Sequence, residues 1–143
     1  MLSDKRLGSA SVVLGLTVAG TIAATGTAAA ASYNGACGSG YSVIDSMDPY
    51  DGHTFLTYNS SNGYNGYNCV VTVSDRPGTA MYLDARLRLS RNDTVWKSSE
   101  MDAGTYKYYA GPVYVYARNS CVDWGSEAGA HSHVRIQYDD HCG

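Results

Sequence analysis

Three histidines near the C-terminus are the side chains of this chain best suited to bind a transition metal. His131 and His133 are two residues apart, so an extended strand would direct both to one face, and His141 follows Asp139 and Asp140. Spacing alone does not show that these groups converge, and a polar, solvent-facing edge strand has the same composition. We therefore expect no metal and no cofactor, while metal binding by the three histidines stays an open alternative.

The serines and the other carboxylates match no motif for catalysis or calcium binding. Asp45, Asp48 and Asp51 lack the alternating spacing of a calcium-binding loop. Gly38-Ser39-Gly40 lacks the full Gly-x-Ser-x-Gly pattern that presents a nucleophilic serine. We therefore expect that the protein is not an enzyme and that it has no catalytic residues.

Tyrosine is the most over-represented side chain, with 13 tyrosines against a single phenylalanine. Tyr106 and Tyr108 are expected on one face of a strand, and Tyr114 and Tyr116 on one face of the next. Such ladders can form a flat surface that binds sugars or proteins, because the ring is rigid and the hydroxyl forms hydrogen bonds. They can also stabilise a sheet by cross-strand pairing, which is the interpretation we favour. These four tyrosines are our candidates for a surface-binding site.

The four cysteines, Cys37, Cys69, Cys121 and Cys142, predict two disulfides. Three connectivities are possible, and we favour Cys37 with Cys69 and Cys121 with Cys142, because each pair joins the ends of a plausible group of strands. A zinc site is disfavoured because the chain has no Cys-x-x-Cys pair. Trp124 is expected in the core or packed against a disulfide.

The elements that must position these residues are strands. After residue 32, β-branched and aromatic runs with a period of two recur between turn residues, and apolar residues at helical spacing are scarce. We predict an all-β fold, an antiparallel β-sandwich or small barrel of about eight strands. The predicted strands are residues 41–47, 54–59, 69–73, 81–89, 94–98, 105–110, 113–118 and 131–138.

The run at 81–89 has the clearest alternation. Its apolar residues, Leu83, Ala85, Leu87 and Leu89, fall on one side, and Tyr82, Asp84, Arg86 and Arg88 fall on the other. We expect the first face to pack in the core and the second face to contact water.

Residues 1–30 have the layout of a secretory signal peptide. Lys5 and Arg6 precede an apolar stretch over residues 7–24, and Ala28-Ala29-Ala30 offers an Ala-x-Ala cleavage site. We expect the mature protein to begin at Ala31, within one or two residues, and to be a single secreted domain over 31–143. Because the stretch contains Gly and Thr and has no positive flank after it, we expect no membrane anchor in the mature form.

The charge balance excludes one class of partner. The chain has 10 Lys and Arg against 13 Asp and Glu, a formal net charge of -3. Without a basic excess the protein lacks the main source of affinity for phosphate backbones, so we expect no nucleic-acid binding.

Five segments carry a family resemblance. They are Tyr-Asn-Gly-Ala-Cys-Gly-Ser-Gly-Tyr at 33–41, Leu-Thr-Tyr-Asn at 56–59, Asn-Cys-Val-Val-Thr at 68–72, Tyr-Ala-Gly-Pro-Val-Tyr at 109–114 and Cys-Val-Asp-Trp-Gly at 121–125. In this order they resemble the spore-associated protein A family of sporulating filamentous bacteria. The resemblance implies a small exported protein found with spores or aerial structures. It implies no catalytic residues that could be transferred to this chain.

These observations predict a secreted, non-enzymatic protein associated with the spore or cell surface. Its expected partner is the spore or cell-wall surface, with polysaccharide as a candidate ligand. An extracellular polysaccharide-binding module is the alternative, motivated by the tyrosine ladders. A secreted protease inhibitor is a third reading, since such inhibitors can share this size and two-bridge scaffold, although no inhibitory loop is recognisable.

Overall fold

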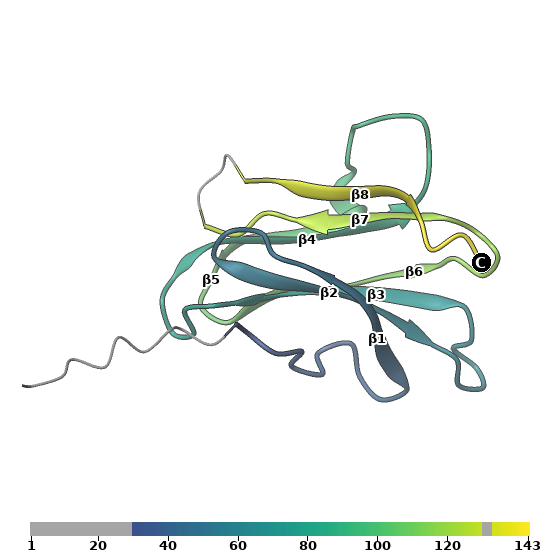
Figure 1. The fold of residues 1–143 in the computed structure, drawn as a ribbon, viewed down its shortest axis with the longest axis horizontal. Helices are drawn as coiled ribbons and strands as arrows, with labels where there is room; N and C mark the ends of the chain where they lie inside the picture. Colours follow the sequence, from purple (N-terminus) through teal and green to yellow (C-terminus); the bar gives the residue numbers. More distant parts are fainter. Residues whose placement is uncertain (1–29, 130–132) are drawn as a thin grey trace, which may run out of the picture.

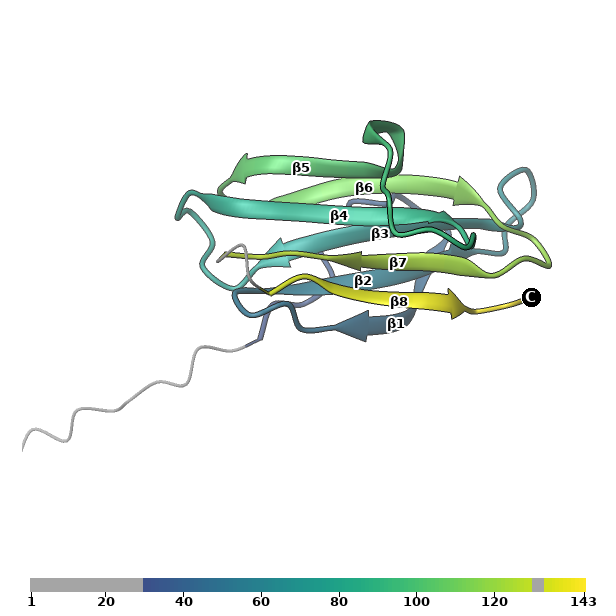
Figure 2. The same ribbon diagram turned by 90° about the horizontal axis from the view of Figure 1, so that it is seen from above.

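Two antiparallel sheets stack face to face in the computed structural model, which describes residues 30–129 and 133–143 (Figures 1 and 2). Sheet A contains, in spatial order, β1 (Tyr41–Met47), β2 (Gly52–Asn59), β3 (Tyr67–Ser74) and β6 (Tyr109–Tyr116). Sheet B contains β5 (Met101–Tyr106), β4 (Met81–Leu89), β7 (Val122–Ser126) and β8 (Arg135–Asp140). The prediction of an all-β sandwich is confirmed.

Two disulfides hold the sandwich outside its main core. Cys37 is bonded to Cys69 and Cys121 to Cys142, the favoured pairing. The bridges close loops with sequence separations of 32 and 21 residues. By the chain-entropy model each contributes about 3 to 4 kcal/mol to stability.

The predicted strands at 41–47 and 81–89 coincide with β1 and β4. Residues 105–110, predicted as one strand, are divided by a bend at Lys107 and Tyr108, where the chain passes from β5 in sheet B to β6 in sheet A. The segment Asp102-Ala103-Gly104, which resembles a turn, instead pairs with β4 because the edge of that strand offers a complete hydrogen-bonding ladder. Pairing with β4 therefore outweighs the turn propensity of these three residues.

Three other segments differ from the prediction. Residues 94–98 lie in a loop that ends in the 3₁₀ turn η1 (Ser98–Glu100), and Val95 is exposed. Strand β7 (Val122–Ser126) was not predicted because it is only five residues long and contains Asp123 and Gly125, residue types that are depleted in strands. Strand β8 begins at Arg135, whereas residues 131–132 of the strand predicted there lie outside the described residues.

The main core lies between the sheets. Leu56 and Val70 of sheet A pack with Leu83, Leu87 and Trp124 of sheet B, and all five are fully buried or nearly so. Trp124 is therefore a core residue, one of its two predicted roles.

Buried hydroxyls join the two sheets within this core. The Oγ1 atom of Thr54 in β2 lies 2.9 Å from that of Thr72 in β3 and is also hydrogen-bonded to Ser126 of β7. Because buried hydroxyls are costly when unpaired, this triad favours one alignment of sheet A over sheet B.

The outer face of β4 is buried, which corrects the expectation that it contacts water. Arg88 is only 2% exposed. Its Nε donates to Asp123 Oδ2 at 2.8 Å and its Nη1 donates to Asp93 Oδ1 at 3.1 Å and to the Val95 carbonyl at 2.7 Å. The ring of Trp96 lies 4.4 Å from the guanidinium carbon. The loop after β4 folds back over sheet B. The Arg88 guanidinium therefore contacts carboxylates, a carbonyl and an aromatic face in place of water.

Two neighbours on β4 also depart from the predicted pattern. Asp84 is fully buried, where it accepts hydrogen bonds from Arg86 and from the Glu127 N–H. Leu89, expected in the core, is 45% exposed because it is the last residue of the strand.

The described residues include no helix with both the length and the apolar character needed to span a membrane.

The buried position of Arg88 predicts a large effect of its removal. Arg88→Ala leaves the Asp123 carboxylate, 1% exposed, without its cation and lowers the free energy of unfolding by about 3 to 5 kcal/mol. Urea unfolding of the oxidised protein measures this value. Lys107→Ala, at an exposed position, is the control and changes stability by less than about 0.5 kcal/mol. Equal effects of the two substitutions would show that Arg88 is solvated.

Acid stability depends on the same carboxylate. Burial acts to raise the pKa of Asp123, but hydrogen bonds from the Ser90 hydroxyl, the Asp139 N–H and Arg88 outweigh it and hold the pKa below its usual value. The group stabilises the fold above the unfolded-state pKa of about 3.9, and this stability is lost as pH falls through the lower folded-state pKa. Asp123→Asn therefore flattens the fall of unfolding free energy below about pH 4. An unchanged pH profile of urea unfolding would contradict this.

Candidate functional site

Residues 31–40, which we call the crossing segment, lie on the outer face of sheet A. Cys37 of this segment is bonded to Cys69 in β3, and both side chains are buried with Val71 in a second small core. Tyr33 packs on Phe55 of β2 with ring centroids 5.8 Å apart. The segment therefore covers apolar side chains of sheet A that would otherwise face water.

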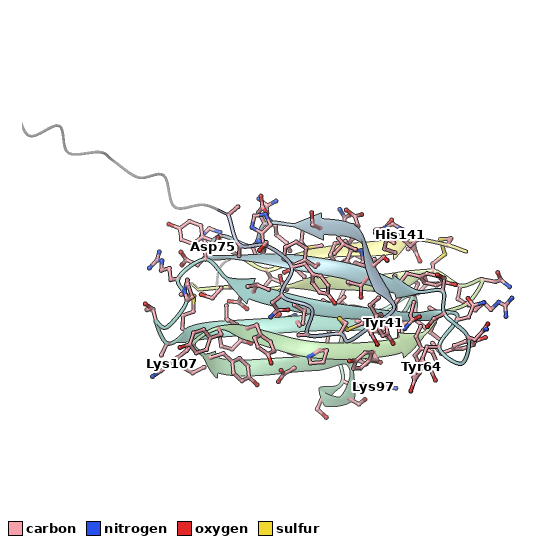
Figure 3. The ribbon with its side chains drawn as sticks, turned by 90° about the horizontal axis from the view of Figure 1, so that it is seen from below. Tyr41, Tyr64, Asp75, Lys97, Lys107 and His141 are labelled. Carbon is pink, nitrogen blue, oxygen red and sulfur yellow. A yellow bond between two sulfur atoms is a disulfide. The ribbon has the colours of Figure 1, made fainter. Side chains whose placement is uncertain are left out.

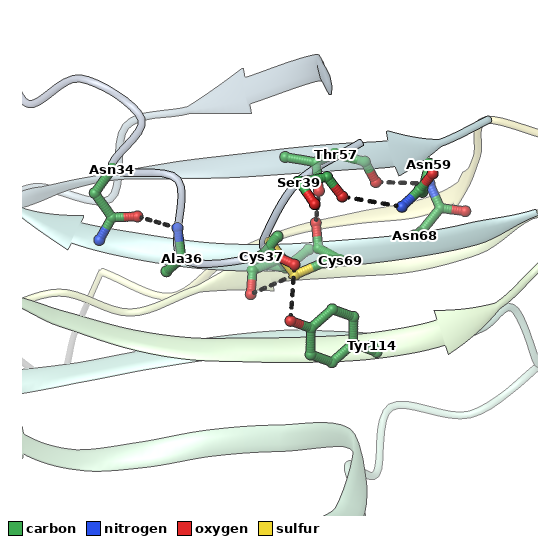
Figure 4. The surroundings of a disulfide bond; sticks show 10 residues. Asn34, Ala36, Cys37, Ser39, Thr57, Asn59, Asn68, Cys69 and Tyr114 are labelled. Atoms are coloured by element: carbon green, nitrogen blue, oxygen red, sulfur yellow. Dashed lines mark hydrogen bonds between the residues drawn. A yellow bond between two sulfur atoms is a disulfide. The ribbon is translucent and has the colours of Figure 1, made fainter. Parts of the chain in front are cut away.

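Hydrogen bonds position the segment around the disulfide (Figure 4). The Tyr114 hydroxyl donates to the Cys37 carbonyl at 2.9 Å, and Asn59 Nδ2 donates to the Ser39 carbonyl at 3.4 Å. Gly40 has a φ of 85°, and a Cβ there would lie 3.0 Å from the Asn59 amide. Glycine is therefore required where the segment turns into β1.

Five tyrosines gather beside the crossing segment, and we call them the aromatic cluster: Tyr41, Tyr64, Tyr67, Tyr114 and Tyr116. Ring centroids are 5.6 Å apart for Tyr41 and Tyr114, 5.3 Å for Tyr67 and Tyr116, and 6.4 Å for Tyr64 and Tyr67. All three pairs are edge-to-face, the arrangement that the aromatic quadrupole favours.

Sheet register explains why these rings meet. Tyr41 in β1 pairs with Asn59 in β2, Asn59 pairs with Tyr67 in β3, and Tyr67 pairs with Tyr116 in β6. One rung across all four strands of sheet A thus carries three tyrosines and an asparagine. Tyr114 belongs to the next rung on this face, opposite Cys69.

The cluster borders a cleft of about 430 Å³. Its lining residues are Cys37, Gly38, Ser39, Tyr41, Asn59, Tyr64, Tyr67 and Tyr114. Tyr64 is 60% exposed and Tyr114 is 45% exposed, so ring faces are open to a ligand, whereas Asn59 is buried. Figure 3 shows Tyr41 and Tyr64 close together toward one end of this face.

The polar atoms of the cleft are hydrogen-bonding groups without charge. Burial raises the pKa of the Tyr114 phenol, and burial followed by the nearby Tyr114 raises that of Tyr41. Both hydroxyls therefore stay protonated at neutral pH, and that of Tyr114, whose proton is donated to the Cys37 carbonyl, can accept a hydrogen bond from a ligand. Exposed ring faces and neutral hydroxyls together suit a ligand with both apolar C–H faces and hydroxyl groups. The Asn59 amide instead supports the wall of the cleft, since it is buried and bonded to Ser39 and Ser61.

The structure separates the four tyrosines chosen from the sequence. Tyr114 and Tyr116 lie in the aromatic cluster. Tyr106 ends β5 in sheet B, where its hydroxyl donates to Asp102, and Tyr108 lies in the bend before β6, 60% exposed. The expected ladder of Tyr106 and Tyr108 is wrong because the chain leaves sheet B between them.

Sequence reasoning missed the other three members of the cluster. Tyr64 and Tyr67 belong to the Asn-Gly-Tyr repeat at 62–68, which reads only as a loop, and Tyr41 begins a predicted strand. The available signal in the sequence was the repetition of tyrosine, at Tyr64 and Tyr67, directly before a predicted strand. Their meeting with β6 depends on a long-range pairing that spacing along the chain does not contain.

A second group of polar side chains lies at the edge of the sandwich that β1 and β8 form. His141 Nε2 is 3.1 Å from Asp45 Oδ2 and 3.5 Å from Asp140 Oδ2. The ligand atoms of the three residues lie within 4.8 Å of one another, so the group has the donors for a divalent ion, and it is equally satisfied as ion pairs of a protonated histidine. It joins β1 to the end of β8, the edge strands on the same side of the two sheets (Figure 2).

The other residues considered for metal binding do not join this group. His133 lies beyond the opposite end of β8 and stacks on Tyr50 with centroids 4.5 Å apart. His131 lies outside the described residues. Asp48 pairs with His53, and Asp51 pairs with Arg76.

Comparison with known proteins gives one informative match. The chain is 44% identical over 117 residues to Spore-associated protein A of Streptomyces coelicolor, an alignment that covers 80% of this chain and 71% of the relative. No model of a known protein family and no solved structure matches it. Identity at this level over most of both chains confirms the resemblance, and the chain belongs to the spore-associated protein A family.

Proposed function

We propose that this protein is exported and acts, without catalysing a reaction, as a component of the spore or cell surface. Membership of a family named for spore association supports the location. The basic, apolar and Ala-x-Ala pattern of residues 1–30 supports export. The two disulfides support a mature domain over 31–143 that works in an oxidising exterior.

The aromatic cleft supports attachment to a polysaccharide, and it is the observation on which this proposal rests. Pyranose rings present C–H faces that pack on aromatic rings and hydroxyls that bond to phenols, amides and carbonyls. The cleft volume, about 430 Å³, lies in the usual range for ligand sites. Because Tyr41, Tyr67 and Tyr116 follow one rung, the surface extends across the sheet, as a chain of sugars requires.

Weak contacts suffice for such a role. Each stacked ring contributes about 0.5 to 1.5 kcal/mol, so a single cleft binds one or two sugars weakly. A polymer offers the same unit many times, and a protein close to its surface rebinds at high effective concentration. Retention at a surface therefore does not require a deep, high-affinity pocket.

The chemical nature of the cleft supports a non-catalytic role. Among the described residues that line it, none carries a carboxylate or an imidazole. Glycoside hydrolysis uses a pair of carboxylates across the bond that is cleaved. The buried carboxylates of Asp84 and Asp123 instead pair with Arg86 and Arg88 on sheet B.

Carbohydrate binding is tested by retention on insoluble polymers. The exported protein is mixed with washed spore walls, peptidoglycan, chitin and insoluble glucan, and the bound fraction is measured. Tyr64→Ala with Tyr116→Ala removes two exposed rings and lowers affinity about tenfold, because each ring contributes about 0.5 to 1.5 kcal/mol.

Tyr138→Ala is the matched control, since Tyr138 is 47% exposed on β8 of sheet B, away from the cleft. It leaves retention unchanged. Near-ultraviolet circular dichroism checks that each variant keeps its packing. If the unmodified protein is retained on none of the polymers, polysaccharide attachment is wrong.

Export is tested separately by fractionation of sporulating cultures. We expect the protein in spore washes, without residues 1–30 and with all four cysteines oxidised, as read by intact mass with and without reduction. Protein confined to the cytosol with its leader attached would contradict the proposed location.

A further inference from the structure

Ala31 makes a specific contact with a carboxylate at the far end of sheet A. The Ala31 nitrogen donates to Asp75 Oδ1 at 3.0 Å. Asp75 directly follows β3, and Figure 3 shows it toward the opposite end of the sheet from Tyr41 and Tyr64. The first residue of the crossing segment is therefore hydrogen-bonded to the residue that follows β3, the strand that carries Cys69.

The surroundings of Asp75 leave it short of positive charge. Its side chain is 25% exposed, and among the described residues its ion-pair partner is His53, whose Nδ1 lies 3.8 Å from Asp75 Oδ1. His53 is itself closer to Asp48, through Nε2. The adjacent Arg76 points to Asp51. A half-buried carboxylate in this position favours a cationic donor over a neutral amide N–H.

We propose that Asp75 is the docking site of a new N-terminal ammonium group, made by cleavage of the Ala30–Ala31 bond. The inference rests on the export proposed above. Hydrolysis adds one water across this peptide bond, leaving a carboxylate on Ala30 and an amine on Ala31 that takes up a proton at neutral pH. The hydrogen bond from a neutral amide N–H to the Asp75 carboxylate then becomes an ion pair between an ammonium group and that carboxylate.

The sequence allows cleavage at more than one neighbouring peptide bond, and only one of these cleavages places the new ammonium group at the Asp75 contact. Residues 28–31 are all alanine, so an Ala-x-Ala site also exists one residue later. Cleavage after Ala31 removes the nitrogen that contacts Asp75. Cleavage after Ala29 leaves the charge on Ala30, an exposed residue one Cα step, about 3.8 Å, farther along the chain. Only cleavage after Ala30 places the ammonium at the 3.0 Å position.

Docking holds the crossing segment at both ends. The Cys37–Cys69 bond and the Tyr114 hydroxyl hold its second half, and the Ala31–Asp75 pair holds its first residue. Between them Tyr33 covers Phe55. Because Cys37, Gly38 and Ser39 form one wall of the aromatic cleft, removal of the leader also secures part of the proposed binding surface.

The test uses protein exported by the producing strain from its full-length gene. Mass spectrometry of the N-terminal peptide identifies the first residue, which we expect to be Ala31. The rate of acetylation of its α-amine by an activated ester at pH 7 is then measured, with Lys97 and Lys107 of the same molecule as internal references.

Asp75→Asn keeps the shape of the side chain but removes its charge, and we expect the α-amine to react about fivefold faster. Asp48→Asn is the matched control: Asp48 contacts the other nitrogen of His53, is 68% exposed and leaves the rate at its original value. If Asp75→Asn is not exported, wild-type protein acetylated at its α-amine supplies the second measurement. It melts about 3 °C below the untreated protein.

A mature protein that begins at Ala30 or Ser32 overturns the inference and leaves the export proposal intact. So does an α-amine that reacts equally fast in the original protein and in Asp75→Asn. Protein that carries residues 1–30 on spores overturns the export proposal and this inference with it. An N-terminus at Ala31 together with the slowed reaction of the original protein establishes the docking site.

Discussion

The Cys37–Cys69 bond is the constraint on which the candidate site depends. A segment of ten residues, mostly small and polar, has too little apolar surface to hold itself on a sheet against its conformational entropy. The cross-link removes much of that entropy cost and buries both sulfurs with Val71. Once the segment is in place, its backbone provides one wall of the cleft, and the Cys37 carbonyl orients Tyr114.

Different segments cover the two outer faces of the sandwich, and the difference explains why the aromatic cluster is exposed on sheet A. On sheet B the loop after β4, which carries Asp93 and Trp96, returns over Arg88, so carboxylates and an aromatic ring satisfy a buried cation. On sheet A the crossing segment covers only part of the face. Beside it, Tyr64, Tyr114 and Tyr116 of the aromatic cluster are exposed, and aromatic surface of this kind is typical of binding sites.

Features that depend on residues close together in the chain were predictable from the sequence, and features that depend on distant residues were not. The period of two in residues 81–89 identified β4, because this signal is local. The even number of cysteines indicated two bridges, and of the three possible connectivities the favoured one is observed. Strand β7 was missed because its five residues include Asp123 and Gly125, which have low strand propensity, and they are held in the sheet by pairing with β4 and β8. The outer face of β4 was misjudged because a charged residue on a strand indicates contact with water unless other parts of the chain bring it partners. Strand β7 brings Asp123 to Arg88, and the loop after β4 brings Asp93.

By itself, the sequence determined the all-β class, the number of cross-links, the leader pattern and the family, since each depends on residue type and spacing along the chain, whereas the structure decided which cysteines pair. Only the tertiary structure decided which tyrosines act together. Tyr114 and Tyr116 meet Tyr41 and Tyr67 through the order β1-β2-β3-β6, which places strands far apart in the chain side by side. Register between distant strands is set by the packing of the whole sandwich, and no local pattern encodes it.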